Sequence, residues 1–154
     1  MNGADFGRAV VVGLIATFVA TIFGYWEVAL GLPKLDFATL LGQDLVSPEL
    51  SKEFAYSLGM AQHFIDGVIF SLLFVRVFEP VLPGPVWLKG LLFGLLVWLG
   101  SGLVASPIHN AGLFWRRWLL PSFFGVLGWH IVWGLVLGIA LSLSHPRGVA
   151  ASRC

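Results

Sequence analysis

Four long runs of apolar residues, separated by more polar segments, dominate the chain. They cover residues 9–30, 54–78, 86–108 and 121–143. Each run is long enough to cross a bilayer as a helix, which takes about 20 mostly apolar residues for roughly 30 Å of hydrocarbon. The runs are continuous rather than alternating, which indicates helices and not strands. We therefore predict an all-α integral membrane protein, a four-helix bundle forming one membrane domain over the whole chain.

The first run lies where a signal peptide would lie. Its apolar stretch is longer than the usual signal-peptide core of about 7–15 residues. The residues before it are also of mixed charge, with Asp5 and Arg8. We expect this run to be a retained membrane helix.

Composition supports a membrane location and excludes several classes of protein. Of the residues, 58% are hydrophobic and only 11% are charged, against about 45–50% and 25% in an average soluble domain. The net charge of +1 gives no sign of nucleic-acid binding. The single cysteine, Cys154, excludes an internal disulfide and a cysteine metal cluster.

The first loop is the longest and contains two helix-start signals. Asp36 precedes a short apolar stretch, residues 37–41, that Gly42 is expected to close. Ser47 followed by Pro48 resembles a second helix start. We expect this loop to lie on the membrane surface.

Basic residues outside the runs suggest an interfacial anchor and an orientation in the membrane. Arg116 and Arg117 lie among aromatic residues, so we expect an interfacial anchor or, alternatively, a site for a lipid phosphate. With both termini in the cytoplasm, five basic residues lie inside and four outside, which favours this topology slightly.

The second and fourth runs share a motif that suggests an internal repeat. Histidine, glycine and a second small residue recur at spacings of four, beginning at His63 and at His130. Residues four apart share one face of a helix. We predict two helical hairpins in parallel orientation, related by a pseudo-twofold axis along the membrane normal.

Small residues are spaced so that helices can approach closely, as membrane helices commonly do. Ala16, Ala20 and Gly24 form one stripe. The glycines that we expect at close helix contacts are Gly59, Gly67, Gly134 and Gly138.

Three ionisable residues lie well inside the runs, away from their ends, and are the candidate functional residues, because ionisable groups are costly in lipid. They are His63, Asp66 and His130. The two histidines fall at similar depth on parallel helices and are candidates to hold a haem b iron from its two faces. The alternatives are a quinone or another transition-metal site, and hydrogen-bonded packing without a ligand.

Asp66 follows His63 by three residues, so the two side chains can share a face and a proton. The alternative is that Asp66 pairs with Arg76 or lies in a water-filled crevice. Glu27, His109 and Asn110 lie near span ends, and we expect them at the membrane interface.

The chain resembles a family of small, uncharacterised bacterial inner-membrane proteins with four helices. The resemblance rests on residues 31–36 (GLPKLD), on residues 82–94 (LPGPVWLKGLLFG) and on the two His-x-x-x-Gly motifs. It implies the bacterial cytoplasmic membrane and four spans. It implies no activity, cofactor or catalytic residue.

Catalytic motifs such as a phosphate loop, a nucleophile elbow or a zinc-binding helix are absent from the sequence. We therefore expect a non-enzymatic accessory subunit or binding protein of a larger membrane complex. It would bind other membrane subunits or copies of itself, with a haem or quinone as its candidate ligand. The alternatives are a small oligomeric transporter that passes protons or a small solute at Asp66, and a redox enzyme subunit with its own haem.

Overall fold

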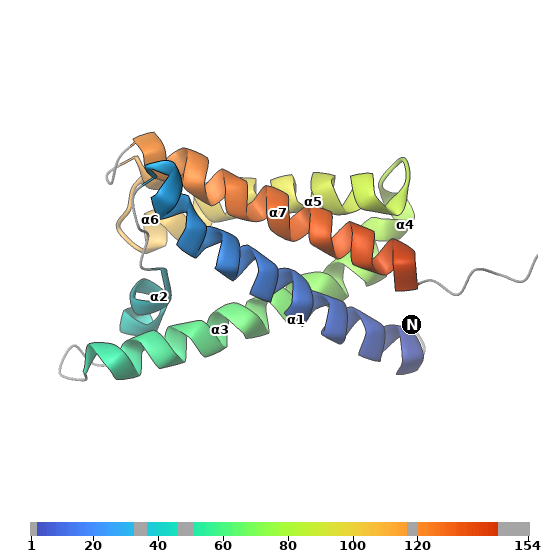
Figure 1. Cartoon of the computed structure of the whole chain (residues 1–154), viewed down its shortest axis with the longest axis horizontal. Coiled ribbons are helices and arrows are strands. Elements are labelled where there is room, and N and C mark those ends of the chain that lie inside the picture. Colours follow the sequence, from blue (N-terminus) through green and yellow to red (C-terminus); the bar gives the residue numbers. More distant parts are fainter. Residues whose placement is uncertain (1–2, 33–36, 46–50, 117–119, 145–154) are drawn as a thin grey trace, which may run out of the picture.

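The computed structural model describes residues 3–32, 37–45, 51–116 and 120–144, which are almost entirely helical and contain no strand. Long helical segments run along the molecule (Figure 1). They are α1 (Gly3–Trp26) with the 3-10 turn η1 (Glu27–Leu30); α3 (Lys52–Leu73), continued by the π turn η2 (Phe74–Phe78) and α4 (Glu79–Val81); α5 (Val86–Gly100), continued by the π turn η3 (Ser101–Ala105) and α6 (Ser106–Ile108); and α7 (Leu120–Ser144). The all-α prediction is confirmed.

Three of these segments are long and apolar enough to cross a membrane: Gly3–Leu30, Val86–Ile108 and Ser122–Ser144. They match three of the four predicted spans, so the chain fits a multi-pass membrane protein. The segment that begins with α3 is not among the three, and it contains Gln62, His63 and Asp66 near its middle. A fourth crossing therefore stays a prediction.

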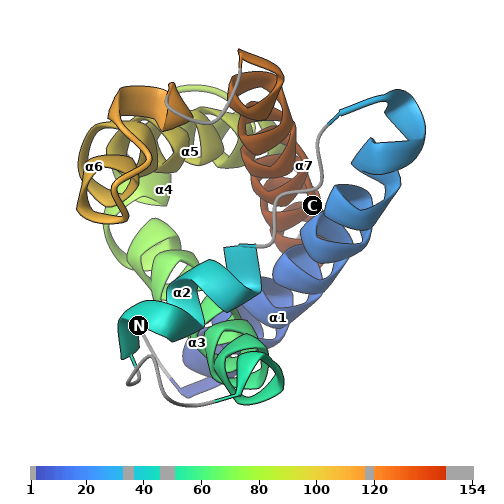
Figure 2. The same ribbon diagram turned by 90° about the vertical axis from the view of Figure 1, so that its left-hand side faces the viewer.

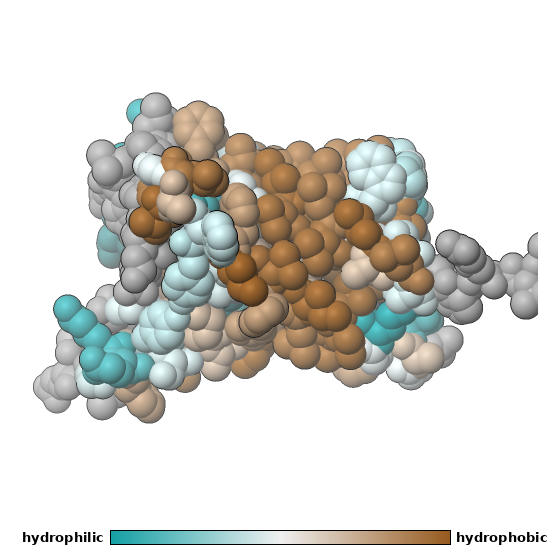
Figure 3. Space-filling view, viewed as in Figure 1, coloured by the Kyte–Doolittle hydropathy of each residue, from teal (hydrophilic) through white to brown (hydrophobic). Residues whose placement is uncertain are grey.

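The surface has the character expected of a protein in lipid. Figure 3 shows a broad hydrophobic band across the middle of one face, with hydrophilic residues toward the two ends. Large apolar side chains on every long segment are exposed, among them Phe18, Ile65, Leu103 and Phe124. A water-soluble protein rarely exposes so much contiguous apolar surface.

The long segments pack as two antiparallel hairpins. α1 packs against α3, α5 packs against α7, and α1 also packs against α7, which joins the hairpins. Figure 2 shows the end view, with α1, α7, α5 and α3 following one another around the molecule. A pseudo-twofold repeat would make the α3–α5 contact equivalent to the α1–α7 contact. In the described residues, α5 meets the second segment mainly at η2 and α4, so the packing between hairpins is asymmetric.

Small residues bring the two helices of the first hairpin into backbone contact. A Cβ atom added to Gly13 would lie 2.8 Å from Ser71 Cβ, and one added to Gly67 would overlap Thr17 Oγ1. The Ser71 hydroxyl donates a hydrogen bond of 2.7 Å to the carbonyl oxygen of Ala9. The face of α3 that contains the His-x-x-x-Gly motif is therefore the face that packs on α1.

The second hairpin is closed in the same way. A Cβ atom on Gly134 would lie 2.5 Å from the carbonyl oxygen of Gly90, and one on Gly138 would lie 2.6 Å from that of Val86. Gly94 faces Gly134 and the backbone of His130. Gly90 with Gly94, and Gly134 with Gly138, thus form two GxxxG pairs that pack against each other.

An aromatic cluster fills the space between the hairpins toward one end. The rings of Phe74 and Phe93 have centroids 5.3 Å apart, and those of Phe93 and Trp133 are 6.0 Å apart. Ala16 and Ala20 of α1 are buried against the same cluster. The stripe of small residues on α1 thus faces the aromatic core.

The described part of the first loop is α2 (Phe37–Leu45), which packs on α3. Cβ atoms on Gly42 and Gly59 would overlap the backbone of Ala55 and Ala38 respectively, so the two helices touch. The expectation that Gly42 ends this helix is wrong, because the close contact with α3 keeps Gly42 inside the helix, which continues to Leu45. Contact with α3, rather than with lipid alone, holds α2.

Local signals explain several helix ends. Ser51 caps α3 by accepting a hydrogen bond of 3.2 Å from the Phe54 backbone N–H. Gly31 ends η1 in the left-handed region, with φ of 81°. The expected cap Asp36 and the expected second start at Ser47 and Pro48 lie outside the described residues.

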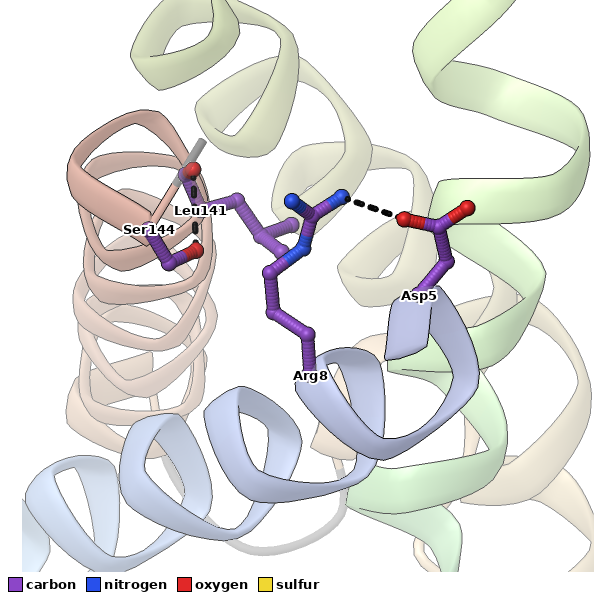
Figure 4. A network of polar contacts seen from close by, with 4 residues as sticks. All are labelled: Asp5, Arg8, Leu141 and Ser144. Atoms are coloured by element: carbon purple, nitrogen blue, oxygen red, sulfur yellow. Dashed lines mark hydrogen bonds and ion pairs between the residues drawn. The ribbon is translucent and has the colours of Figure 1, made fainter. Parts of the chain in front are cut away.

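Arg8, near the start of α1, lies close to the last turn of α7 (Figure 4). Arg8 forms an ion pair of 3.2 Å with Asp5. Figure 4 shows the Arg8 side chain between Asp5 and the last turn of α7, at Leu141 and Ser144. A cation near the C-terminus of a helix is favourable because carbonyl groups there are unpaired. The N-terminal end of α1 and the C-terminal end of α7 thus lie at the same end of the molecule (Figure 1).

The glycine contacts predict the effect of adding one methyl group. We expect Gly134→Ala to destabilise the protein by about 1–3 kcal/mol, because the methyl group would be forced against the Gly90 backbone. The control is Gly100→Ala, since nothing lies within 4 Å of a Cβ atom at Gly100. Thermal unfolding in detergent measures both. Equal midpoints for the two variants would contradict the close contact.

Candidate functional site

Two threonines on α1 organise the polar interior. The Thr17 hydroxyl donates 2.8 Å to the Gly13 carbonyl, and the Thr21 hydroxyl donates 2.8 Å to the Thr17 carbonyl. Each hydroxyl therefore has only its lone pairs left for other partners. Both are buried, so they can serve as acceptors for donors from neighbouring helices.

A ring N–H group from a neighbouring helix donates a hydrogen bond to each of these two hydroxyl oxygens. Trp133 of α7 donates from Nε1 to Thr17 Oγ1 over 3.2 Å. His63 Nε2 lies 3.2 Å from Thr21 Oγ1. Since the Thr21 proton is used toward Thr17, His63 Nε2 must be the donor, which assigns its proton to Nε2.

The His63 ring is covered by the first residue of α2. Its centroid lies 4.6 Å from that of Phe37. Phe37 in turn meets Trp129 of α7 edge-on at 4.7 Å. Phe37 thus lies between α3 and α7, on the side where the sequence analysis placed a ligand.

His130 is held by its own hairpin. Its Nδ1 lies 2.7 Å from the Val126 carbonyl oxygen, which can only accept, so Nδ1 carries a proton. Its Nε2 lies 3.5 Å from Ser101 Oγ. The Ser101 hydroxyl donates to the Trp98 carbonyl over 3.0 Å. Like His63, His130 thus faces a hydroxyl on the first helix of its own hairpin.

This arrangement does not fit a haem held by the two histidines. An axial ligand must present an unprotonated nitrogen to the iron. His63 Nε2 donates to Thr21 on α1, whereas His130 Nε2 faces Ser101 at the end of α5. The two nitrogens are therefore directed at different helices, and Phe37 occupies one face of the His63 ring. The contacts also occupy the ring nitrogen of His63 that would bond a quinone.

Asp66 lies about 60° around α3 from His63, on the side turned away from Gly67. It precedes Gly67 by one residue and so projects about 100° away from the face that packs on α1. Gln62, one turn earlier, hydrogen-bonds its carboxyl group. Asp66 is half-buried, and Arg76 is exposed at the far end of the segment. Among the described residues Arg8 and Asp5 form an ion pair, whereas Asp66 and Arg76 do not.

Glu27 lies in different surroundings from those predicted from the sequence. It was expected at the membrane interface, but its side chain is only 1% exposed and lies between α1 and α7. A Cβ atom on Gly125 would lie 3.0 Å from Glu27 Oε2, and one on Gly128 would lie 3.3 Å from Oε1. The signal in the sequence was the glycine pair of α7, which leaves room for a longer side chain.

The remaining candidates lie at the molecular ends. Arg116 is exposed, and Arg117 lies outside the described residues. His109 and Asn110 form the turn after α6, with Asn110 at φ of 56°. Within the described part of the chain, no cluster of three or more His, Cys, Asp or Glu side chains is placed to hold a metal ion.

Comparison with known proteins gives a family but no activity. A family model described as a family of unknown function (DUF6789) matches residues 4–150. No curated protein and no solved structure matches the chain. The resemblance to an uncharacterised family is confirmed by the family model.

The hydroxyl acceptors give a second testable prediction. We expect Thr21→Val, which preserves the side-chain shape, to destabilise the protein by about 0.6–1.7 kcal/mol, the range of interhelical hydrogen bonds in membrane proteins. Ser142→Ala is the control, because the Ser142 hydroxyl is exposed and donates only within its own helix. Thermal unfolding in detergent measures both variants. If Thr21→Val unfolds at the wild-type temperature, the His63–Thr21 bond does not contribute.

Proposed function

The chain belongs to the DUF6789 family, whose function is unknown, and we propose that it is a non-enzymatic accessory subunit of a larger assembly in the bacterial cytoplasmic membrane. The observation that carries the proposal is the polar flank of α3. We define this flank by four residues on one side of the helix: Gln62, Asp66, Ile69 and Leu73.

The C-terminal half of the α3 flank, at Ile69 and Leu73, is exposed, whereas its N-terminal half continues the stripe of Ala55 and Gly59 on which α2 packs. α3 packs closely on α1, through the face that contains Gly67, and on α2 near its start. Ile69 is 53% exposed and Leu73 is 39% exposed. The flank therefore presents a half-buried carboxyl group beside accessible apolar side chains.

An acidic group at this place is unfavourable in contact with lipid. Carboxyl groups within membrane segments almost always face a protein interior or a partner. The other three long segments show apolar side chains at their exposed positions, for example Phe18, Leu103 and Phe124. The difference in chemistry favours a protein surface, rather than lipid, against the α3 flank.

The partner's chemistry follows from the groups on the flank. A helix with a hydrogen-bond donor at the depth of Asp66 would satisfy the carboxyl group, and apolar side chains would cover Ile69 and Leu73. Polar contacts between membrane helices are each worth about 1–2 kcal/mol in model peptides. Such a helix can belong to another subunit or to a second copy of this chain.

We also propose that both termini lie in the cytoplasm. The N-terminal end of α1 and the C-terminal end of α7 lie at the same end of the molecule (Figure 1), as an even number of crossings requires. Arg8 and Lys89 lie near that end. Basic residues prefer the cytoplasmic side.

A photo-crosslinking experiment in native membranes tests the proposal. A photoreactive residue replaces Ile69 or Leu73 on the α3 flank and, as matched exposed controls, Phe18 or Phe124 on other helices. We expect a discrete protein adduct from the two flank positions, identified by mass spectrometry. Asp66→Leu should weaken it about fivefold to thirtyfold, as expected for a loss of 1–2 kcal/mol.

Equal cross-linking from all four positions, or lipid adducts alone from the flank, would contradict the proposal. An adduct between two copies of the chain would identify the partner as the chain itself. An adduct that is unchanged by Asp66→Leu would show that the carboxyl group does not contribute to docking.

A further inference from the structure

Glu27 is a second intramembrane polar group, separate from the α3 flank. It lies in η1, at the end of the first candidate span, and is 1% exposed. Its carboxyl group lies against α7 at Gly125 and Gly128, where only hydrogen atoms separate it from the helix backbone. Any larger residue at these two positions would meet the carboxyl oxygens.

The surroundings of Glu27 contain no cation among the described residues. α7 contributes Gly125, Gly128 and Trp129 on this side, and α1 contributes Phe23 and Gly24. None of these groups titrates. Glu27 Oε1 has no hydrogen-bond partner in the described part of the chain. The Trp129 indole N–H is the neutral donor beside the carboxyl group. A buried carboxylate without a cation is strongly unfavourable.

We propose that Glu27 is an intramembrane proton-binding site. The carboxylate takes one proton from water at the membrane surface, forming an O–H bond and a neutral acid, and returns the proton to water when it ionises. In the protonated state α1 and α7 pack together at Gly125 and Gly128, as they do in the structure. In the ionised state the charge favours opening of that contact to water.

The packing favours a proton over a larger cation. A metal ion such as Ca²⁺ or Mg²⁺ needs about six or more oxygen ligands, and Glu27 belongs to no cluster of potential ligands among the described residues. The glycine contacts of about 3 Å leave the carboxyl oxygens close to the α7 backbone. A proton adds no volume and removes the charge.

Infrared spectroscopy of the full chain in lipid tests this directly. A protonated carboxyl group gives a carbonyl stretching band that a carboxylate or a glutamine lacks. We expect a pH-dependent band of this kind in the wild type, its loss in Glu27→Gln, and its retention in Asp66→Asn and in the exposed control Glu53→Gln. Loss of the band only in Asp66→Asn, or in neither variant, would overturn the proposal.

A second measurement covers the case in which Glu27→Gln does not fold. Selective ¹³C labelling of glutamate carboxyl groups in the wild-type protein shifts the infrared bands of glutamate and leaves those of aspartate in place. We expect the pH-dependent carbonyl band to shift with the glutamate label. A band that stays in place would overturn the assignment to Glu27.

Discussion

Gly67 lies against the Thr17 side chain, and Gly134 lies against the Gly90 backbone. These two contacts set the distance between the helices of each hairpin. In lipid the hydrophobic effect does not drive helices together, so association depends on close packing and interhelical hydrogen bonds. Large side chains at these positions would separate the helices and break both. The polar interior and the aromatic core both depend on this close approach.

The same contacts determine the surroundings of the two histidines. Each hairpin brings one histidine to a hydroxyl of its first helix: His63 to Thr21 and His130 to Ser101. The threonine hydroxyl first donates within its own helix and then accepts from the ring. Polar residues in the middle of α3 are therefore satisfied partly within the protein, which lowers the cost of placing that helix in a membrane. Asp66, which points away from α1, does not share this protection.

Sequence patterns predicted the helices and the small-residue stripes, because continuous apolar runs and spacings of four depend only on local geometry. They did not predict the rotation of each helix, which packing between helices sets. The sequence therefore could not show that His63 and His130 face separate hydroxyls, or that Phe37 covers His63. Glu27 was misjudged for the same reason: its position near a span end suggested the interface, whereas Gly125 and Gly128 allow α7 to bury it. The end of α2 was missed because Gly42 is a contact residue and not a helix stop.

The central claim is that α3 crosses the membrane with its polar residues held against α1 and a partner. Single cysteines at Lys52 and at Pro83, on either side of this segment, test it in a Cys154→Ser background, since Cys154 is the only native cysteine. In intact bacteria a membrane-impermeant maleimide should label Lys52→Cys and leave Pro83→Cys unlabelled until the membrane is opened. Labelling of both positions from the same side would contradict the crossing of α3.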